Sequence, residues 1–154
     1  MPNMLIEEIA PDFWRIEDIC NVYIVKRDQH AIAIDFGSGK WLDELDSLGI
    51  NQLDHVLLTH HHDDQCRGLS IRDSWPFDIH SPVGEDKFLD PEKSGEFHRA
   101  PWLESGCPAS YSAPRKRIPG IKYDLNGFRE FYWNDKCFRI IHTPGHGPNA
   151  CSIV

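Results

Sequence analysis

The segment THHHDDQCRG, residues 59–68, places three histidines and two aspartates in close succession. It follows Leu53–Thr59, an apolar run typical of a strand buried on both faces. Imidazole nitrogens and carboxylate oxygens are zinc ligands, and burying so many polar groups without a metal or partners is costly. We therefore expect His60, His62 and Asp64 to face one cleft, whereas His61 points away into solvent. A solvated polar loop is the alternative interpretation.

A second polar segment, HTPGHGP at residues 142–148, also follows a β-rich run. Pro144 fixes its own φ angle and Gly145 permits a sharp turn, so the loop projects His146 in a defined direction. A Pro-Gly turn that carries a histidine is common, and this segment alone indicates no function.

Together the two segments resemble the metallo-β-lactamase superfamily, whose signature reads T-H-x-H-x-D-H and later T-P-G-H-[ST]. The matching positions are Thr59, His60, His62 and Asp64, followed by Thr143, Pro144, Gly145 and His146. Asp35-Phe36-Gly37 also resembles the early D-T-G turn of the family. The resemblance spans the chain but only the N-terminal half of the family's fold. It implies an α/β class, the first half of a four-layer αβ/βα sandwich, in one domain over residues 1–154.

The resemblance also implies the roles of individual residues. His60, His62 and His146 would hold one metal ion, with zinc as the first choice and iron or manganese as alternatives. Asp64 would bind a second metal or orient the attacking water. Such a metal lowers the pKa of its water to about 7 and stabilises a developing oxyanion, so the implied activity is hydrolysis of a small molecule that the sequence does not identify. Asp35 would support the metal loop from the second shell.

Two departures from the family pattern predict an impaired second metal position. Gln65 stands where the family has a second-site histidine, and a carboxamide is a poorer ligand than imidazole. The chain ends soon after His146, before the family's later carboxylate and last histidine, so it is expected to be truncated after the third-ligand loop. Two alternatives stay open: a catalytically impaired or non-catalytic binding module, and an inactive fragment of a longer enzyme. An apolar sheet face left open would need a homodimer or a missing C-terminal half as its cover.

Composition restricts the remaining possibilities. The 154 residues, 40% of them hydrophobic, fit one globular domain, and the net charge of −8 disfavours nucleic acid as a partner. No apolar run approaches the roughly 18 residues of a membrane span, and the N-terminus lacks the basic region of a secretory signal. Five widely spaced cysteines without a CxxC pair indicate free thiols in a reducing, cytoplasmic compartment.

Local patterns predict the elements around these loops. Four strands are expected early in the chain, followed by a helix, further short elements and a late hairpin. The expected ranges are Met4–Ile9, Phe13–Glu17, Val22–Lys26 and Ala31–Phe36 as strands, Trp41–Leu48 as a helix ended by Gly49, Phe77–His80 as a strand, Glu85–Leu89 as a helix, Phe128–Trp133 with Cys137–His142 as the hairpin, and Ala150–Val154 as the start of a strand. Residues 91–120 show only weak periodicity. The histidines at positions 30, 55, 80 and 98 show no ligand spacing, so ordinary polar roles are expected for them.

Overall fold

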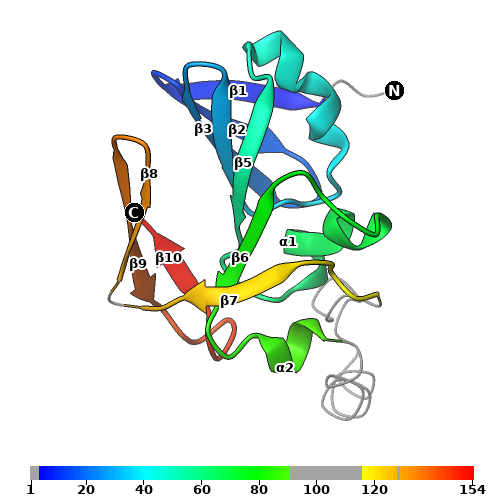
Figure 1. Ribbon diagram of the computed structural model, residues 1–154, viewed down its shortest axis with the longest axis vertical. Helices are drawn as coiled ribbons and strands as arrows, with labels where there is room; N and C mark the ends of the chain where they lie inside the picture. The colour runs from blue at the N-terminus through cyan, green and yellow to red at the C-terminus, as the bar shows by residue number, and fades with distance from the viewer. Residues whose placement is uncertain (1–3, 91–115, 128) are drawn as a thin grey trace.

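A computed structural model describes residues 4–90, 116–127 and 129–154 (Figure 1). Within these residues a seven-stranded sheet runs from β1 to β7 in chain order, and a three-stranded sheet has the order β10-β9-β8. The first four strands pair antiparallel, whereas β4 to β7 pair in parallel. The strands are β1 (Leu5–Ala10), β2 (Phe13–Glu17), β3 (Asn21–Arg27), β4 (His30–Ile34), β5 (Gln52–Leu57), β6 (Asp78–Pro82), β7 (Ile121–Leu125), β8 (Glu130–Trp133), β9 (Lys136–His142) and β10 (Cys151–Ile153).

Short helical segments cover one face of the large sheet. They are the 3-10 helix η1 (Lys40–Leu48), α1 (Asp63–Cys66), the 3-10 helix η2 (Arg67–Ile71) and α2 (Asp86–Leu89). η1 begins after Gly39 and ends before Gly49, and both glycines adopt the left-handed conformation that favours glycine. Trp41 is fully buried, and its indole N–H donates a 2.7 Å hydrogen bond to the carbonyl of Phe36. This bond and the buried rings anchor the helical layer beside the turn that follows β4.

Strand alternation places two separate apolar clusters on the two faces of the large sheet. Ala33 of β4 and Val56 of β5 pack on the helical side. Ile32 and Leu57, their neighbours in the chain, pack on the opposite side. Both strands are therefore buried on both faces, which the apolar run at residues 53–59 predicted for β5.

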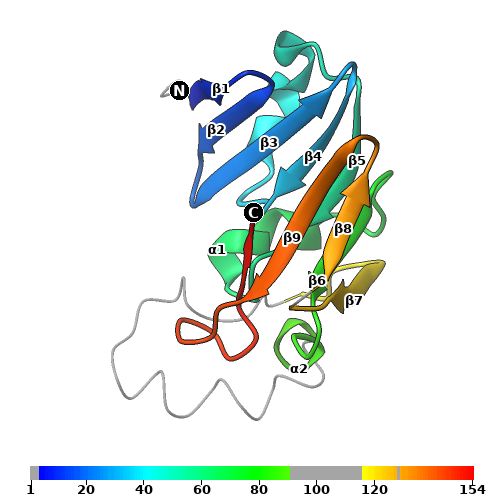
Figure 2. The same cartoon turned by 90° about the vertical axis from the view of Figure 1, so that its left-hand side faces the viewer.

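The three-stranded sheet covers the second face of the large sheet (Figure 2). Trp133, Phe138 and Ile140 from β8 and β9 pack against Ile32 and Leu57. The chain thus forms three layers: helices, the large sheet and the small sheet. The expectation of an open apolar sheet face was wrong around β4 and β5, because the late hairpin and β10 pack over Ile32 and Leu57 there.

The other element predictions agree with the structure to within a few residues, with three omissions. The sequence reading missed β7, and it treated α1 and η2 as loop. Two parts of the predictions lie outside the described residues: residues 91–115, which include His98, and Phe128. Within the described part of the chain, no helix has the length and apolar character needed to cross a membrane.

Candidate metal centre

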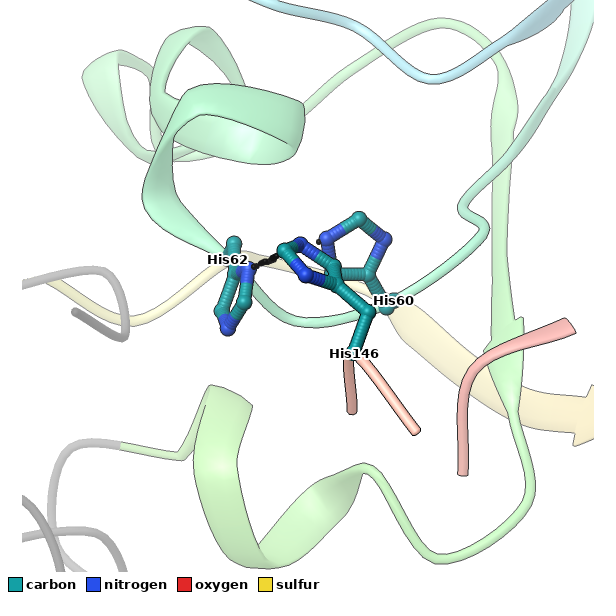
Figure 3. A group of neighbouring side chains, drawn as sticks. All are labelled: His60, His62 and His146. Atoms are coloured by element: carbon teal, nitrogen blue, oxygen red, sulfur yellow. Dashed lines mark hydrogen bonds between the residues drawn. The ribbon is translucent and has the colours of Figure 1, made fainter. Parts of the chain in front are cut away.

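Two loops bring three histidines to one point beyond the strand ends. His60 and His62 follow β5, and His146 lies in the connection from β9 to β10. Nε2 of His60 lies 3.1 Å from Nδ1 of His62, and that Nδ1 atom lies 3.0 Å from Nε2 of His146. Figure 3 shows the three rings turned toward one another. The structure thus brings together the three histidines that the sequence singled out.

The separations between these nitrogens match those of metal ligands. Ligand atoms in a tetrahedral zinc site, with bonds of about 2.0–2.1 Å, lie about 3.3 Å from one another. The three ring nitrogens all lie within 4.8 Å of one another. His60 and His62 are buried and His146 is exposed, so the group is anchored on one side and open on the other. The arrangement fits one metal ion with a coordination position left for a further ligand.

A hydrogen-bond relay behind His60 sets the direction of its ring. The hydroxyl of Thr59 donates to the Asp35 carboxylate at 2.9 Å, and the same carboxylate accepts the Thr59 backbone N–H at 2.9 Å. The Thr59 oxygen also lies 2.9 Å from Nδ1 of His60. When Asp35 is ionised, the hydroxyl proton of Thr59 goes to Asp35, and Nδ1 of His60 is then the donor of its contact with Thr59. Its Nε2 lone pair then points at the other two histidines, as metal binding requires.

Burial shifts the pKa values of two groups in this relay, His60 and Asp35. Burial, together with the neighbouring His146 and His61, lowers the pKa of His60 to about 4, which favours the neutral imidazole. Burial also raises the pKa of Asp35 to about 7, against the opposing effect of its hydrogen bonds from Thr59. Neutral imidazole is the form that binds metal. A cation held by His60 would in turn favour the ionised form of Asp35.

Asp64 lies in the first turn of α1 and is not a member of the three-histidine group. Its Oδ2 accepts a 3.1 Å hydrogen bond from the Gln65 carboxamide. Its Oδ1 is buried without a hydrogen-bond partner among the described residues, and burial raises the pKa of the carboxyl group. An unsatisfied buried oxygen on a carboxyl group that interacts electrostatically with His146 fits a site that receives a cation or a water molecule.

Gln65 connects the metal loop to the turn after β4. Its backbone carbonyl accepts hydrogen bonds from the backbone N–H groups of Phe36 at 2.8 Å and Gly37 at 3.1 Å. Its side chain meanwhile fixes one oxygen of Asp64. Gln65 therefore holds the loop through its backbone and positions Asp64 through its carboxamide.

The prediction that His61 points into solvent was wrong. Its side chain is buried, and its ring stacks on Phe88 with centroids 4.3 Å apart. Nδ1 of His61 lies 2.7 Å from Oε2 of Glu85, which is fully buried just before α2. Strand alternation does not continue past β5, because the chain turns into α1 directly after His62. No local sequence signal indicated this partner, which lies 24 residues further along the chain.

The structure also groups His55 with Asp78 and His80, although sequence spacing assigned neither histidine to a site. The two histidines lie on β5 and β6, and their proximity depends on how these strands pair. Period-two alternation predicts which residues of each strand share a face. Without the register between β5 and β6, however, it does not predict that His55, Asp78 and His80 lie together.

A three-layer α/β sandwich with histidines converging beyond its strand ends defines an α/β domain with a candidate metal site. The family model described as the metallo-β-lactamase superfamily matches residues 15–154, so the chain belongs to that superfamily. Family membership and the histidine group support a divalent metal cofactor.

Individual relatives match most of this chain. A hydroxyacylglutathione hydrolase of Aeromonas salmonicida is 27% identical over 127 residues, which are 81% of this chain and 38% of the relative. A Cronobacter sakazakii metallo-β-lactamase with an HARLDQ motif has a TM-score of 0.68 at 19% identity, covering 96% of this chain and 58% of its own. Native FEZ-1 metallo-β-lactamase from Legionella gormanii has a TM-score of 0.71 at 15% identity, and the match covers 99% of this chain and 58% of that protein. The chain thus spans less than two thirds of each of these proteins.

Proposed function

We propose that this chain carries the metal centre of a metal-dependent hydrolase that cleaves an activated acyl bond. The convergence of His60, His62 and His146 on one point carries the proposal. Three imidazole ligands and an open fourth position suit zinc, which is our first choice of metal. When bound, zinc makes a water-derived nucleophile available near neutral pH and stabilises negative charge on a carbonyl oxygen.

Residues of this chain would form the walls of the site, orient a metal ligand and assist the attacking water. His60 and His62 form the buried wall of the site, while the exposed His146 borders the side on which a substrate arrives. Asp35 and Thr59 fix the ring of His60. Asp64, whose Oδ1 is buried without a hydrogen-bond partner among the described residues, would accept a proton or a hydrogen bond from a water molecule at the site.

The relatives favour an acyl substrate. The names hydroxyacylglutathione hydrolase and β-lactamase describe hydrolysis of a thioester and of a strained amide. In both reactions water adds to a carbonyl carbon and the leaving atom takes up a proton. We therefore propose attack of water on an activated carbonyl carbon as the shared chemistry. The assay below identifies the leaving group.

Gln65 is compatible with this proposal. Residues 60–65 read HHHDDQ and share the first His and the final Asp-Gln with the HARLDQ motif of the Cronobacter protein. A glutamine directly after the aspartate therefore occurs in a protein named as a metallo-β-lactamase. In this chain Gln65 positions Asp64 and is not needed as a metal ligand.

Activity assays with controlled metal content test the proposal. The purified chain is stripped by a chelator, reloaded with zinc and assayed on a hydroxyacylglutathione thioester and on a β-lactam. We expect turnover of one substrate class that disappears on stripping, returns with zinc and is absent from His62→Ala. His30→Gln is the matched control, because His30 is a half-exposed histidine outside the group. A zinc-loaded, folded chain that turns over neither class, or turnover that survives stripping, would refute the proposal.

A further inference from the structure

A second group of ligating side chains lies on the sheet itself, away from the loops of the first centre. His55 comes from β5, and Asp78 and His80 come from β6. The parallel register places His55 beside Asp78 and Leu57 beside His80. Neighbouring residues of paired strands project from the same face, as do residues two apart in one strand. All three side chains therefore project from the sheet face that carries Leu57 and packs against the small sheet.

The ligand atoms of this group are already close together. Nδ1 of His55 lies 3.1 Å from Nε2 of His80 and 4.0 Å from Oδ2 of Asp78. All three atoms lie within 4.8 Å of one another. The distance between the two nitrogens approaches the roughly 3.3 Å separation of ligands in a tetrahedral zinc site. It also equals the 3.1 Å between His60 and His62 in the first centre.

The ring of His80 is held in the orientation of a ligand. Its Nδ1 donates to the carboxylate of Asp124 on β7, at 2.9 and 3.0 Å from the two oxygens. Its Nε2 lone pair then faces His55. A carboxylate behind the second nitrogen is the usual support of a metal-binding histidine.

Phe131 of β8 packs against both rings of the group. Its ring centroid lies 5.2 Å from that of His55 and 5.0 Å from that of His80, each in an edge-on arrangement. Burial, together with the neighbouring His80, lowers the pKa of His55, which favours the neutral ring. The two imidazoles are thus fixed in position before any ligand arrives.

We propose that His55, Asp78 and His80 bind a divalent transition-metal ion, with zinc as the best match, at a site separate from the first centre. Two imidazoles and one carboxylate form a known donor set for zinc, and the half-exposed Asp78 leaves a coordination position open to water. An ion here would link β5 to β6. It would also stabilise the folded chain, because the unfolded chain does not gather the three ligands.

Lys122 would compete with a metal ion for the carboxylate of Asp78. Its ammonium group lies 2.8 Å from Oδ2 of Asp78, the same oxygen that faces His55. Both side chains are about half exposed, and an ion pair of this kind contributes little to stability. A bound metal can therefore displace Lys122, and Lys122→Gln should bind zinc several-fold more tightly than the wild type.

Zinc stoichiometry of the full chain tests the proposal directly. We expect the folded double variant His60→Ala/His62→Ala to keep one zinc per chain and to show a thermal unfolding midpoint that rises with added zinc. Adding Asp78→Asn or His55→Gln should abolish both effects, whereas adding His30→Gln should change neither. In the chain with an intact first centre, Asp78→Asn should lower the zinc count by one, so the test does not depend on folding of the double variant.

Other outcomes would overturn the proposal. A folded double variant without bound zinc would show that the group is a hydrogen-bond array only. Equal zinc binding with and without Asp78→Asn and His55→Gln would place the ion elsewhere. Neither result bears on the hydrolase activity, which depends on the first centre.

Discussion

His61 Nδ1 and Glu85 Oε2 lie 2.7 Å apart inside the protein, joining the metal loop to the segment that begins α2. Truncating Glu85 to alanine leaves a buried polar ring without this partner, which costs about 1–3 kcal/mol. We expect Glu85→Ala to lower the free energy of unfolding by that amount in urea titrations. The control is Lys87→Ala, an exposed position within α2, which should change the free energy of unfolding little. Equal stability of the two variants would mean that the buried contact does not hold the loop.

The relay from Asp35 through Thr59 to His60 predicts a selective effect on metal affinity. Thr59→Val removes the hydroxyl that accepts from Nδ1 of His60 while keeping the shape of the side chain. Loss of such a support weakens metal binding about 10–100-fold. Thr59→Ser keeps the hydroxyl and should bind zinc almost as the wild type does. Competition with a chelating dye measures both affinities, and equal values for the two variants would contradict the relay.

The raised pKa of Asp35 predicts a pH dependence of stability in the metal-free protein. The folded state holds the Asp35 proton up to about pH 7, whereas the unfolded state releases it near the ordinary aspartate pKa of 3.8. The stabilising contribution is therefore complete below the unfolded pKa and is lost as pH rises through 7. Relative to Asp35→Asn, the wild type should lose at most about 4 kcal/mol across this interval. Parallel pH profiles of the two proteins would show that Asp35 is not perturbed.

The backbone around Gly68, next to the metal loop, leaves no room for a larger side chain. A Cβ atom at this position would lie 2.4 Å from the Ser38 carbonyl oxygen, a backbone atom that cannot easily move. Gly68→Ala should destabilise the fold by about 1–3 kcal/mol, the usual cost of overpacking. Gly147→Ala is the matched control, because its nearest new contact would be an ordinary 3.6 Å. Denaturant unfolding of both variants checks the difference, and equal stabilities would refute it.

The sequence predicted the parts of the fold and site that depend on local pattern. The early strands follow from alternation, and His60, His62 and His146 follow from two short motifs at strand ends. The partners of His61 and His80 could not be predicted in this way. Each depends on a residue at least 24 positions distant, brought close by packing or by strand register. The covering sheet was missed for a similar reason, since nothing local in β8 and β9 specifies the face on which they pack.

A crystal structure of the zinc-loaded chain, with anomalous diffraction at the zinc edge, determines whether His60, His62 and His146 bind the metal ion. We predict an anomalous peak bonded to Nε2 of His60, Nδ1 of His62 and Nε2 of His146, each at about 2.0–2.2 Å. Full zinc loading with no peak at this point, and with the three imidazoles still in contact only with one another, would contradict the account.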